Sequence, residues 1–177
     1  LKPHISQLMN KHTNICLNVI LDHSRHLLNR LHDNSIDVCF SYLATNEISY
    51  KCIPYKTDEI IFVTNSQNIQ FSNGIHNSEI LHLPIIYSKF MPKSGFDWIH
   101  DIFPPHYVFQ FTISVIKEII PFLLQYPYYA FLPRKLIENE LKDGLLIEIP
   151  LLDYHIPPLQ SYIIMKSNAK YNPLDYF

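Results

Sequence analysis

The chain has 177 residues, of which 47% are apolar and 17% charged, so it can bury a globular core. Fourteen basic and sixteen acidic residues give a formal net charge of −2, and the sequence contains no basic run. A free-standing nucleic-acid binder normally carries a basic surplus on one face. The composition therefore excludes a disordered chain, and any contact with DNA is expected from another part of the molecule.

Cysteine and glycine usage limits the chemistry that the chain can carry. Cys16, Cys39 and Cys52 form no CxxC pair, and Cys16 and Cys39 lie within apolar runs, so we interpret the cysteines as buried, reduced residues of a cytoplasmic protein; a disulfide and a redox switch are the alternatives. Three glycines leave no phosphate-binding loop, and we predict no cofactor. No stretch approaches the roughly 18 apolar residues that span a bilayer, so no membrane contact is predicted. The first residues resemble neither a signal peptide nor a translation start, and we expect a preceding segment.

The first part of the chain alternates predicted helices and strands. Helical spacing of apolar residues predicts helices over 2–12 and 25–33, the second capped by Ser24. Apolar or alternating runs predict strands at 14–21, 36–42, 50–55 and 59–65. Strand 14–21, helix 25–33 and strand 36–42 have the spacing of a βαβ unit with a buried parallel strand.

The second part begins after a polar stretch, 66–78, which we interpret as a loop and a lobe boundary. Pro121 is expected to kink or restart a helix, and Gly144 is expected to end one. The predicted strands are 83–87, 107–112, 128–132, 145–149 and 161–166, and the predicted helices are 95–102, 116–124 and 134–142, before a tail or helix at 169–177. The fold class is therefore α/β throughout.

Residues 132–151 (LPRKLIENELKDGLLIEIPL) carry a more specific signal. They resemble the strand, proline, helix, Asp-Gly, strand and proline series of LysR-type transcriptional regulators. Further segments resemble that family in the same order: LLNRLHDNSIDVCF at 27–40, DEIIFVT at 58–64, EILHLPII at 79–86 and LQSYIIMK at 159–166. The ordered series, more than any one motif, carries the resemblance.

The resemblance implies a periplasmic-binding-protein-like fold with two Rossmann-like lobes and a ligand cleft between them. Lobe I would comprise residues 1–65 and 159–177, and lobe II residues 66–158. Strands 59–65 and 161–166 would be the two crossovers. The winged helix-turn-helix that precedes this module in the family is absent from the sequence.

The resemblance also implies a function. The chain would be a cytoplasmic effector-sensing domain, not an enzyme, that binds a small anionic or polar molecule and controls transcription. DNA would be contacted only through the absent N-terminal domain. A homodimer is expected, with a homotetramer for the full-length protein, and the helix at 2–12 is expected to provide the self-association surface or to pack within its own chain.

The first candidate effector contacts lie around the second predicted helix. By family position, the first effector loop falls at residues 22–24, and the N-terminus of a helix attracts anions. His23 and Ser24 are therefore candidates, although Ser24 alternatively only caps the helix. Tyr42 ends the strand at 36–42 at the edge where open α/β sheets bind ligands, and plain packing is an equal alternative.

Four further candidates end predicted strands in lobe II. Thr112 and Ser114 lie at a strand-to-helix junction, with a capping pair as the alternative interpretation. Tyr87 and Ser88 close the strand at 83–87. By analogy with the family, Thr112 and Ser114 would face the cleft, and Tyr87 and Ser88 are further candidates for contact with the effector.

The segment before the proline-helix motif departs from the family. Tyr126 and Tyr128 stand where the family has small glycines, and Pro127 stiffens the turn between them. These two tyrosines are predicted to narrow the local space and to project into the cleft.

Two other classes of function remain as alternatives. A solute-binding protein of a transport system shares the fold and would require a secretion signal. An enzyme on this scaffold would need a convergent acid–base set, and the sequence shows neither GxSxG nor HExxH. Ten histidines include no pair at i, i+4, so we predict solvated histidines and no metal site.

Overall fold

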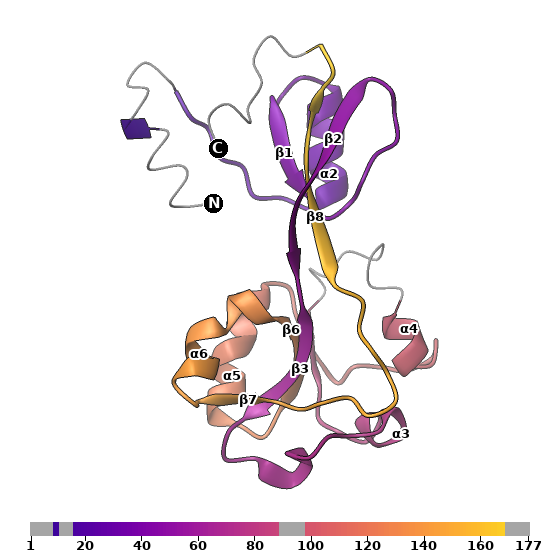
Figure 1. Cartoon of the computed structure of the whole chain (residues 1–177), viewed down its shortest axis with the longest axis vertical. Helices are drawn as coiled ribbons and strands as arrows, with labels where there is room; N and C mark the ends of the chain where they lie inside the picture. Colours follow the sequence, from indigo (N-terminus) through magenta and orange to yellow (C-terminus); the bar gives the residue numbers. More distant parts are fainter. Residues whose placement is uncertain (1–8, 11–15, 89–97, 169–177) are drawn as a thin grey trace. The chain divides into compact units, whose positions relative to one another are not determined.

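The computed structural model describes residues 9–10, 16–88 and 98–168 (Figure 1). Met9 and Asn10 are helical, whereas the rest of the helix predicted at 2–12 and the tail at 169–177 lie outside the described residues. The elements in chain order are α2 (Ser24–His32), β1 (Val38–Ser41), β2 (Tyr50–Asp58), β3 (Ile60–Asn65), η1 (Ile69–Phe71), α3 (Asn77–Ile80), β4 (Ile86–Ser88), α4 (Ile99–Ile102), β5 (Phe111–Ile113), η2 (Ile116–Glu118), α5 (Ile119–Gln125), β6 (Tyr129–Pro133), η3 (Arg134–Leu136), α6 (Glu138–Lys142), β7 (Leu146–Glu148) and β8 (Leu159–Lys166).

The chain forms two compact units. Unit 1 comprises Leu1–Pro54 with Tyr162–Phe177, and unit 2 comprises Tyr55–Ser161. The chain therefore enters unit 2 within β2 and leaves it within β8. The expected boundary at residue 66 and the crossover at 59–65 differ from this division, because β3 pairs with β6 and β7 and so belongs to unit 2.

Unit 1 is a three-stranded sheet, in the order β1-β8-β2, with α2 packed on it. Leu31, Cys39 and Ile164 form one small buried cluster of unit 1, and Ile163 and Met165 of β8 are buried as well. Burial, and to a lesser extent the neighbouring thiol of Cys52, raises the pKa of Cys39 to about 11. Cys39 is therefore an apolar core residue, as expected, whereas Cys16 is exposed and not buried in an apolar run.

The βαβ unit predicted at the start of unit 1 is not formed by the described residues. Residues 16–21 contain no strand, and Leu17, Val19 and Leu21 are 39%, 59% and 90% exposed. β1 pairs antiparallel with β8, with Cys39 opposite Ile164, so the prediction of a parallel strand was wrong. An alternating pattern stabilises a strand only when a neighbouring strand completes its hydrogen bonds, and no strand pairs with residues 16–21 here.

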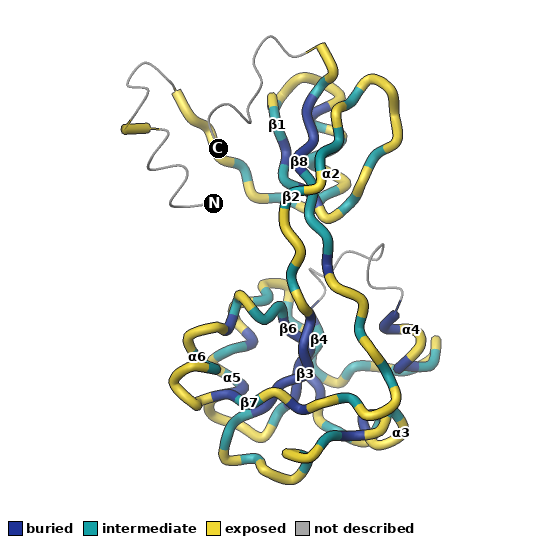
Figure 2. The backbone as a smooth tube through the Cα atoms, in the orientation of Figure 1, coloured by how far each residue is buried: buried dark blue, intermediate teal, exposed yellow. Residues whose placement is uncertain are grey.

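Unit 2 has a central sheet of buried strands (Figure 2). β3 pairs antiparallel with β6 and β7, and β4 pairs parallel with β5. A parallel bridge between Ile85 and Tyr129 places β4 beside β6, so the strands follow the order β5-β4-β6-β3-β7. Phe62 and Tyr129 belong to a core cluster that includes residues of α3 and α4, while Ile61 and Leu132 belong to a second cluster with residues of α5.

Local signals in unit 2 explain where its helices begin and end. Pro121 is the third residue of α5, where its missing N–H costs no intrahelical hydrogen bond, so the helix restarts after η2 as the proline indicated. The helix predicted at 134–142 is divided into η3 and α6 at Ile137, whose φ of −119° is not helical. Gly144 follows α6 with a φ of 66°, the left-handed conformation that ends a helix.

Gly74 is expected to resist substitution more than Gly144. At Gly74, φ is 110°, and a Cβ atom would lie 2.5 Å from Leu152 Cδ2 and 3.0 Å from the carbonyl oxygen of Pro150. We expect Gly74→Ala to lower the free energy of unfolding by about 1–3 kcal/mol. Gly144→Asn is the matched control, because a Cβ atom there meets nothing within 4 Å and asparagine tolerates the left-handed region. Urea unfolding followed by Trp98 fluorescence compares them, and equal midpoints would contradict the expectation.

Candidate functional site

In unit 1, the structure brings the predicted effector loop together with Tyr42. The hydroxyl oxygen of Ser24 accepts a hydrogen bond of 3.3 Å from the backbone N–H of Tyr42. Ser24 is the first residue of α2, and the N-cap is His23, which makes no side-chain capping bond. The prediction that Ser24 caps the helix was therefore wrong, because the Ser24 hydroxyl contacts the end of β1 instead. Tyr42 is 39% exposed.

A carboxylate already occupies the start of α2. Asp22 Oδ1 accepts hydrogen bonds from the backbone N–H of His23, at 2.8 Å, and lies 3.0 Å from His26 Nδ1. The bond from the His23 backbone, followed by the contact with His26, lowers the pKa of Asp22 below its ordinary value. Arg30 Nε lies 3.6 Å from the other carboxylate oxygen. A second anion beside this loop would therefore be repelled by the Asp22 carboxylate, whereas a neutral polar group would not.

In unit 2, three of the predicted residues lie together at one end of the parallel pair. β4 and β5 are in register with Tyr87 opposite Thr112 and Ser88 opposite Ile113, and Ser114 directly follows β5. Ser88, Thr112 and Ser114 therefore lie at the carboxyl ends of these strands. Ser88 is 2% exposed, whereas Thr112 and Ser114 are exposed, so the two exposed hydroxyls can reach a ligand.

Tyr87 is chiefly a packing residue. Its ring stacks on that of Phe109 with centroids 4.4 Å apart, and burial raises the pKa of its phenol. The ring is half-buried against the larger core cluster of unit 2. Tyr87 therefore supports the strand end that carries Ser88.

Tyr126 and Tyr128 are separated from the other predicted residues of unit 2. Both precede β6, which runs parallel to β4, so they lie near the amino ends of these strands, opposite the ends that carry Ser88 and Ser114. The ring of Tyr128 packs against Phe111, with centroids 5.6 Å apart, and Tyr126 is 50% exposed. The structure brings these tyrosines together with each other, at 6.2 Å between rings, and not with Thr112.

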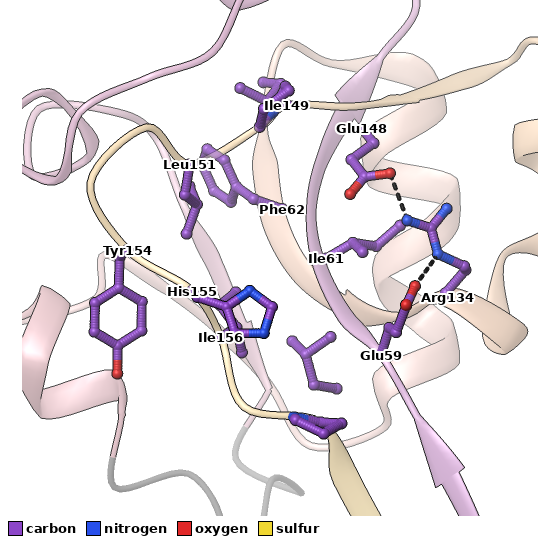
Figure 3. Close-up of a pocket in the computed structure, with 13 residues that line it drawn as sticks. Glu59, Ile61, Phe62, Arg134, Glu148, Ile149, Leu151, Tyr154, His155 and Ile156 are labelled. Atoms are coloured by element: carbon purple, nitrogen blue, oxygen red, sulfur yellow. Dashed lines mark hydrogen bonds and ion pairs between the residues drawn. The ribbon is translucent and has the colours of Figure 1, made fainter.

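A cavity within unit 2 was not predicted from the sequence. It has a volume of about 390 Å³ and is lined by the start of β3, the end of β7 and the segment 150–158 (Figure 3). Arg134 donates hydrogen bonds to Glu59, at 2.5 Å, and to Glu148, at 2.6 Å, at its rim. These bonds, led by the one to Glu148, raise the pKa of Arg134. Arg134 and Glu148 both lie in the segment 132–151, but Glu59 is 75 residues from Arg134, so no local motif brings the three together.

The comparisons with known proteins identify the chain. The LysR substrate binding domain family matches residues 1–174. The chain belongs to this family. The match confirms the resemblance drawn from residues 132–151 and its companions, and with it the periplasmic-binding-protein-like α/β fold. No curated protein matches the chain by sequence.

Solved structures of LysR-type regulators share the fold of this domain. The regulatory domain of MetR from Neisseria meningitidis is 12% identical with a TM-score of 0.77, and the match covers 99% of this chain and 81% of that one. A full-length OxyR variant from Pseudomonas aeruginosa is 13% identical with a TM-score of 0.75, over 99% of this chain and 61% of that one. CrgA from Neisseria meningitidis is 11% identical with a TM-score of 0.72, over 94% and 57%. The LysR-type domain thus spans less than two thirds of the full-length regulators, and likeness at this identity concerns the fold alone.

The described residues contain neither a candidate membrane span nor a candidate metal site. No helix in the described part of the LysR-type domain is long and apolar enough to cross a membrane. Within residues 9–10, 16–88 and 98–168, no three histidine, cysteine, aspartate or glutamate side chains are grouped so that they could hold a metal ion.

The phenol of Tyr154, in the segment 150–158 of the LysR-type domain, is expected to lose its proton at a higher pH than an ordinary tyrosine. Tyr154 donates a hydrogen bond of 2.6 Å to Asp101 Oδ2, and burial, followed by this bond, raises the pKa of Tyr154 to about 12. An unfolded tyrosine titrates near pH 10, so the stability that this phenol contributes is present below about pH 10 and is lost as the pH rises to about 12. We expect phenolate absorbance to show one late tyrosine that Asp101→Asn shifts to lower pH. Coincident titration curves for the two proteins would contradict this.

Proposed function

We propose that this chain is the effector-sensing domain of a LysR-type DNA-binding transcription factor. A small polar or anionic molecule binds it and controls transcription through a DNA-binding domain outside this sequence. The protein works in the cytoplasm as a homodimer, or as a homotetramer at full length. The family match over residues 1–174 is the observation that carries this proposal.

The proposed contacts are hydroxyl-bearing side chains at the start of α2 and at the carboxyl ends of strands. In unit 1 they are Ser24 and Tyr42, whose positions are coupled by a hydrogen bond, with His23 beside them. In unit 2 they are Thr112 and Ser114, supported by Ser88. Carboxyl ends of strands are where open α/β sheets bind ligands, and the expected cleft between the lobes is part of the proposal.

The effector is expected to carry more than one hydrogen-bonding group. Thr112 and Ser114 each offer a hydroxyl that donates and accepts, and Ser24 adds a third. Since Asp22 already places a negative charge beside Ser24, the anionic group of an effector is expected to be directed to unit 2. Small hydroxy acids and amino acids meet these requirements.

A thermal-shift screen of the chain against small metabolites tests the proposal. A true effector at about 100 times its Kd adds close to 2.7 kcal/mol of stability and raises the melting temperature by several degrees. We expect Thr112→Val with Ser114→Ala to remove this shift. Ser78→Ala, at an exposed position of α3, is the matched control and should retain it. Failure of every small polar and anionic compound to stabilise the chain would refute the proposal.

A further inference from the structure

A second cavity lies in unit 1, where α2 ends beside the end of β8 (Figure 1). Its volume is about 450 Å³, which lies within the range of small-molecule pockets. The residues that line it all carry a polar group: His32, Ser49, Tyr50, Lys166, Ser167 and Asn168. This lining includes one permanent cation, Lys166, and no carboxylate. The cavity is therefore suited to a polar ligand that carries negative charge.

Among the described residues, the ammonium group of Lys166 is bound only by neutral oxygens. It donates hydrogen bonds of 3.2 Å to the carbonyl oxygen of His32 and of 2.5 Å to Oδ1 of Asn34. Lys166 is half-buried, and none of the ion pairs between described residues involves it. An ammonium group has three N–H donors, so one remains for a ligand. Because its charge is partly removed from water and not neutralised by an acid, an incoming anion would stabilise it.

The two acidic residues closest in sequence to the lining do not line the cavity. Asp33 follows α2, and its Oδ1 accepts a hydrogen bond of 3.0 Å from the backbone N–H of Ser35. Glu47 precedes β2 and is exposed, and its backbone carbonyl accepts from the N–H of Tyr50. Neither carboxylate belongs to the lining, so Lys166 determines the charge of the cavity.

Hydrogen bonds hold the walls of the cavity in place. The backbone N–H of Ser167 donates to the carbonyl oxygen of Ser49, and the hydroxyl of Ser167 donates to that of Ile48, both at 2.9 Å. Tyr50 is half-buried and packs against the buried cluster of unit 1. Ser49 and Asn168 are exposed, so their hydroxyl and amide groups can donate to a ligand. The walls therefore do not have to be assembled when a ligand enters.

The cavity is separate from the residues of unit 1 that are proposed to bind the effector. Ser24 begins α2, whereas His32 ends it, about 12 Å further along the helix axis. Tyr42 follows the carboxyl end of β1, whereas β8 ends at Lys166 beside the amino end of β1. A ligand in this cavity would therefore leave the proposed effector residues unoccupied.

We propose that this cavity is a second ligand site of the protein, for a phosphate monoester of a small polyol or sugar. Lys166 and the hydroxyl of Ser49 hold the phosphate, whose three terminal oxygens accept more hydrogen bonds than a carboxylate can. The amide of Asn168 binds a hydroxyl group of the ligand, and the ring of Tyr50 forms the wall on which its carbon chain lies.

Amide NMR titrations of the whole chain with three probes of similar size test the site. Glycerol 3-phosphate carries a phosphate, glycerate carries a carboxylate, and glycerol carries no charge. We expect glycerol 3-phosphate to shift the amide signals of Tyr50, Lys166 and Ser167. It should bind at least about fivefold more tightly than either other probe, because only the phosphate satisfies both the charge and the donors of the cavity.

Substitution of Lys166 tests its role against a matched lysine of the same unit. Lys166→Met should bind glycerol 3-phosphate at least roughly fivefold more weakly. Lys51→Met is the control, because Lys51 is an exposed residue of β2 that does not line the cavity, and it should leave the affinity unchanged. Lys166 also holds the end of α2, so a variant that keeps it is needed. Ser49→Ala with Asn168→Ala leaves Lys166 in place and should weaken binding at least about threefold.

The inference is overturned if glycerol 3-phosphate at millimolar concentration shifts none of these amides, or if glycerol or glycerate binds as tightly. Equal effects of Lys166→Met and Lys51→Met would overturn it as well, and so would a double variant that binds like the original chain. None of these outcomes affects the proposed effector function, which concerns other residues.

Discussion

Replacing Phe62 with alanine is expected to lower the free energy of unfolding of unit 2 by about 3–5 kcal/mol. Phe62 is 1% exposed in the middle of β3, and its ring lies 4.6 Å from that of Phe131 and 5.6 Å from that of Tyr129. Alanine would leave a cavity that the paired strands on either side cannot close. Urea unfolding followed by the fluorescence of Trp98 measures the loss, because this tryptophan contacts Phe131 at 5.1 Å between rings.

Ile69→Ala is the control for this experiment. Ile69 is also an apolar residue of unit 2 but is 71% exposed, so its truncation should change the free energy of unfolding by no more than about 0.5 kcal/mol. Similar effects of the two substitutions would mean that Phe62 is not packed as described.

Replacing Leu31 with alanine is expected to destabilise unit 1 by about 2–5 kcal/mol while leaving unit 2 unchanged. Leu31 is 1% exposed and is the buried residue of α2, packed with Cys39 and Ile164, whereas Leu27 and Leu28 are only partly buried against this cluster. Because the cluster is small, the loss of Leu31 is expected to release α2, and with it Ser24, from the sheet. Amide hydrogen exchange of Val38–Ser41 should therefore accelerate by at least roughly 30-fold, the equivalent of 2 kcal/mol.

The same experiment tests whether the two units unfold separately. Trp98 lies in unit 2, so its fluorescence reports the unfolding of that unit. The urea midpoint measured in this way should be the same in the Leu31→Ala variant as in the original chain. Leu21→Ala is the matched control, because Leu21 is 90% exposed and its truncation should not alter exchange in β1. If the urea midpoint followed by Trp98 fluorescence falls in the Leu31→Ala variant along with the hydrogen-exchange protection of β1, the two units unfold as one.

Elements with strong local signals were predictable from the sequence. The helix at 25–33 is α2, the β-branched and aromatic run at 59–65 is β3, and Pro121 and Gly144 mark the start and the end of helices as expected. Local sequence could not reveal strand partners. The alternation at 14–21 predicts a strand, but no strand pairs with residues 16–21, and the polar stretch after residue 65 suggests a boundary that strand pairing places earlier.

The candidate site was predictable where family position and strand ends agree. Ser24 and Tyr42 are 18 residues apart in the sequence and are joined by a hydrogen bond, which supports naming them together, although not the capping role of Ser24. The placement of Tyr126 was not predictable, because it depends on β6 lying parallel beside β4, which the local sequence does not reveal. The same holds for Glu59 and Arg134, which are 75 residues apart and meet only through the pairing of β3 with β6.

Amide NMR mapping of the best ligand from the thermal-shift screen tests the central claim most directly. A regulator that senses a small polar molecule should show the largest shifts at Ser24 and Tyr42 in unit 1 and at Thr112 and Ser114 in unit 2, all saturating at one ligand concentration. If the amide signals of these residues do not shift at a saturating concentration of the ligand, the assignment of this chain as an effector sensor is contradicted.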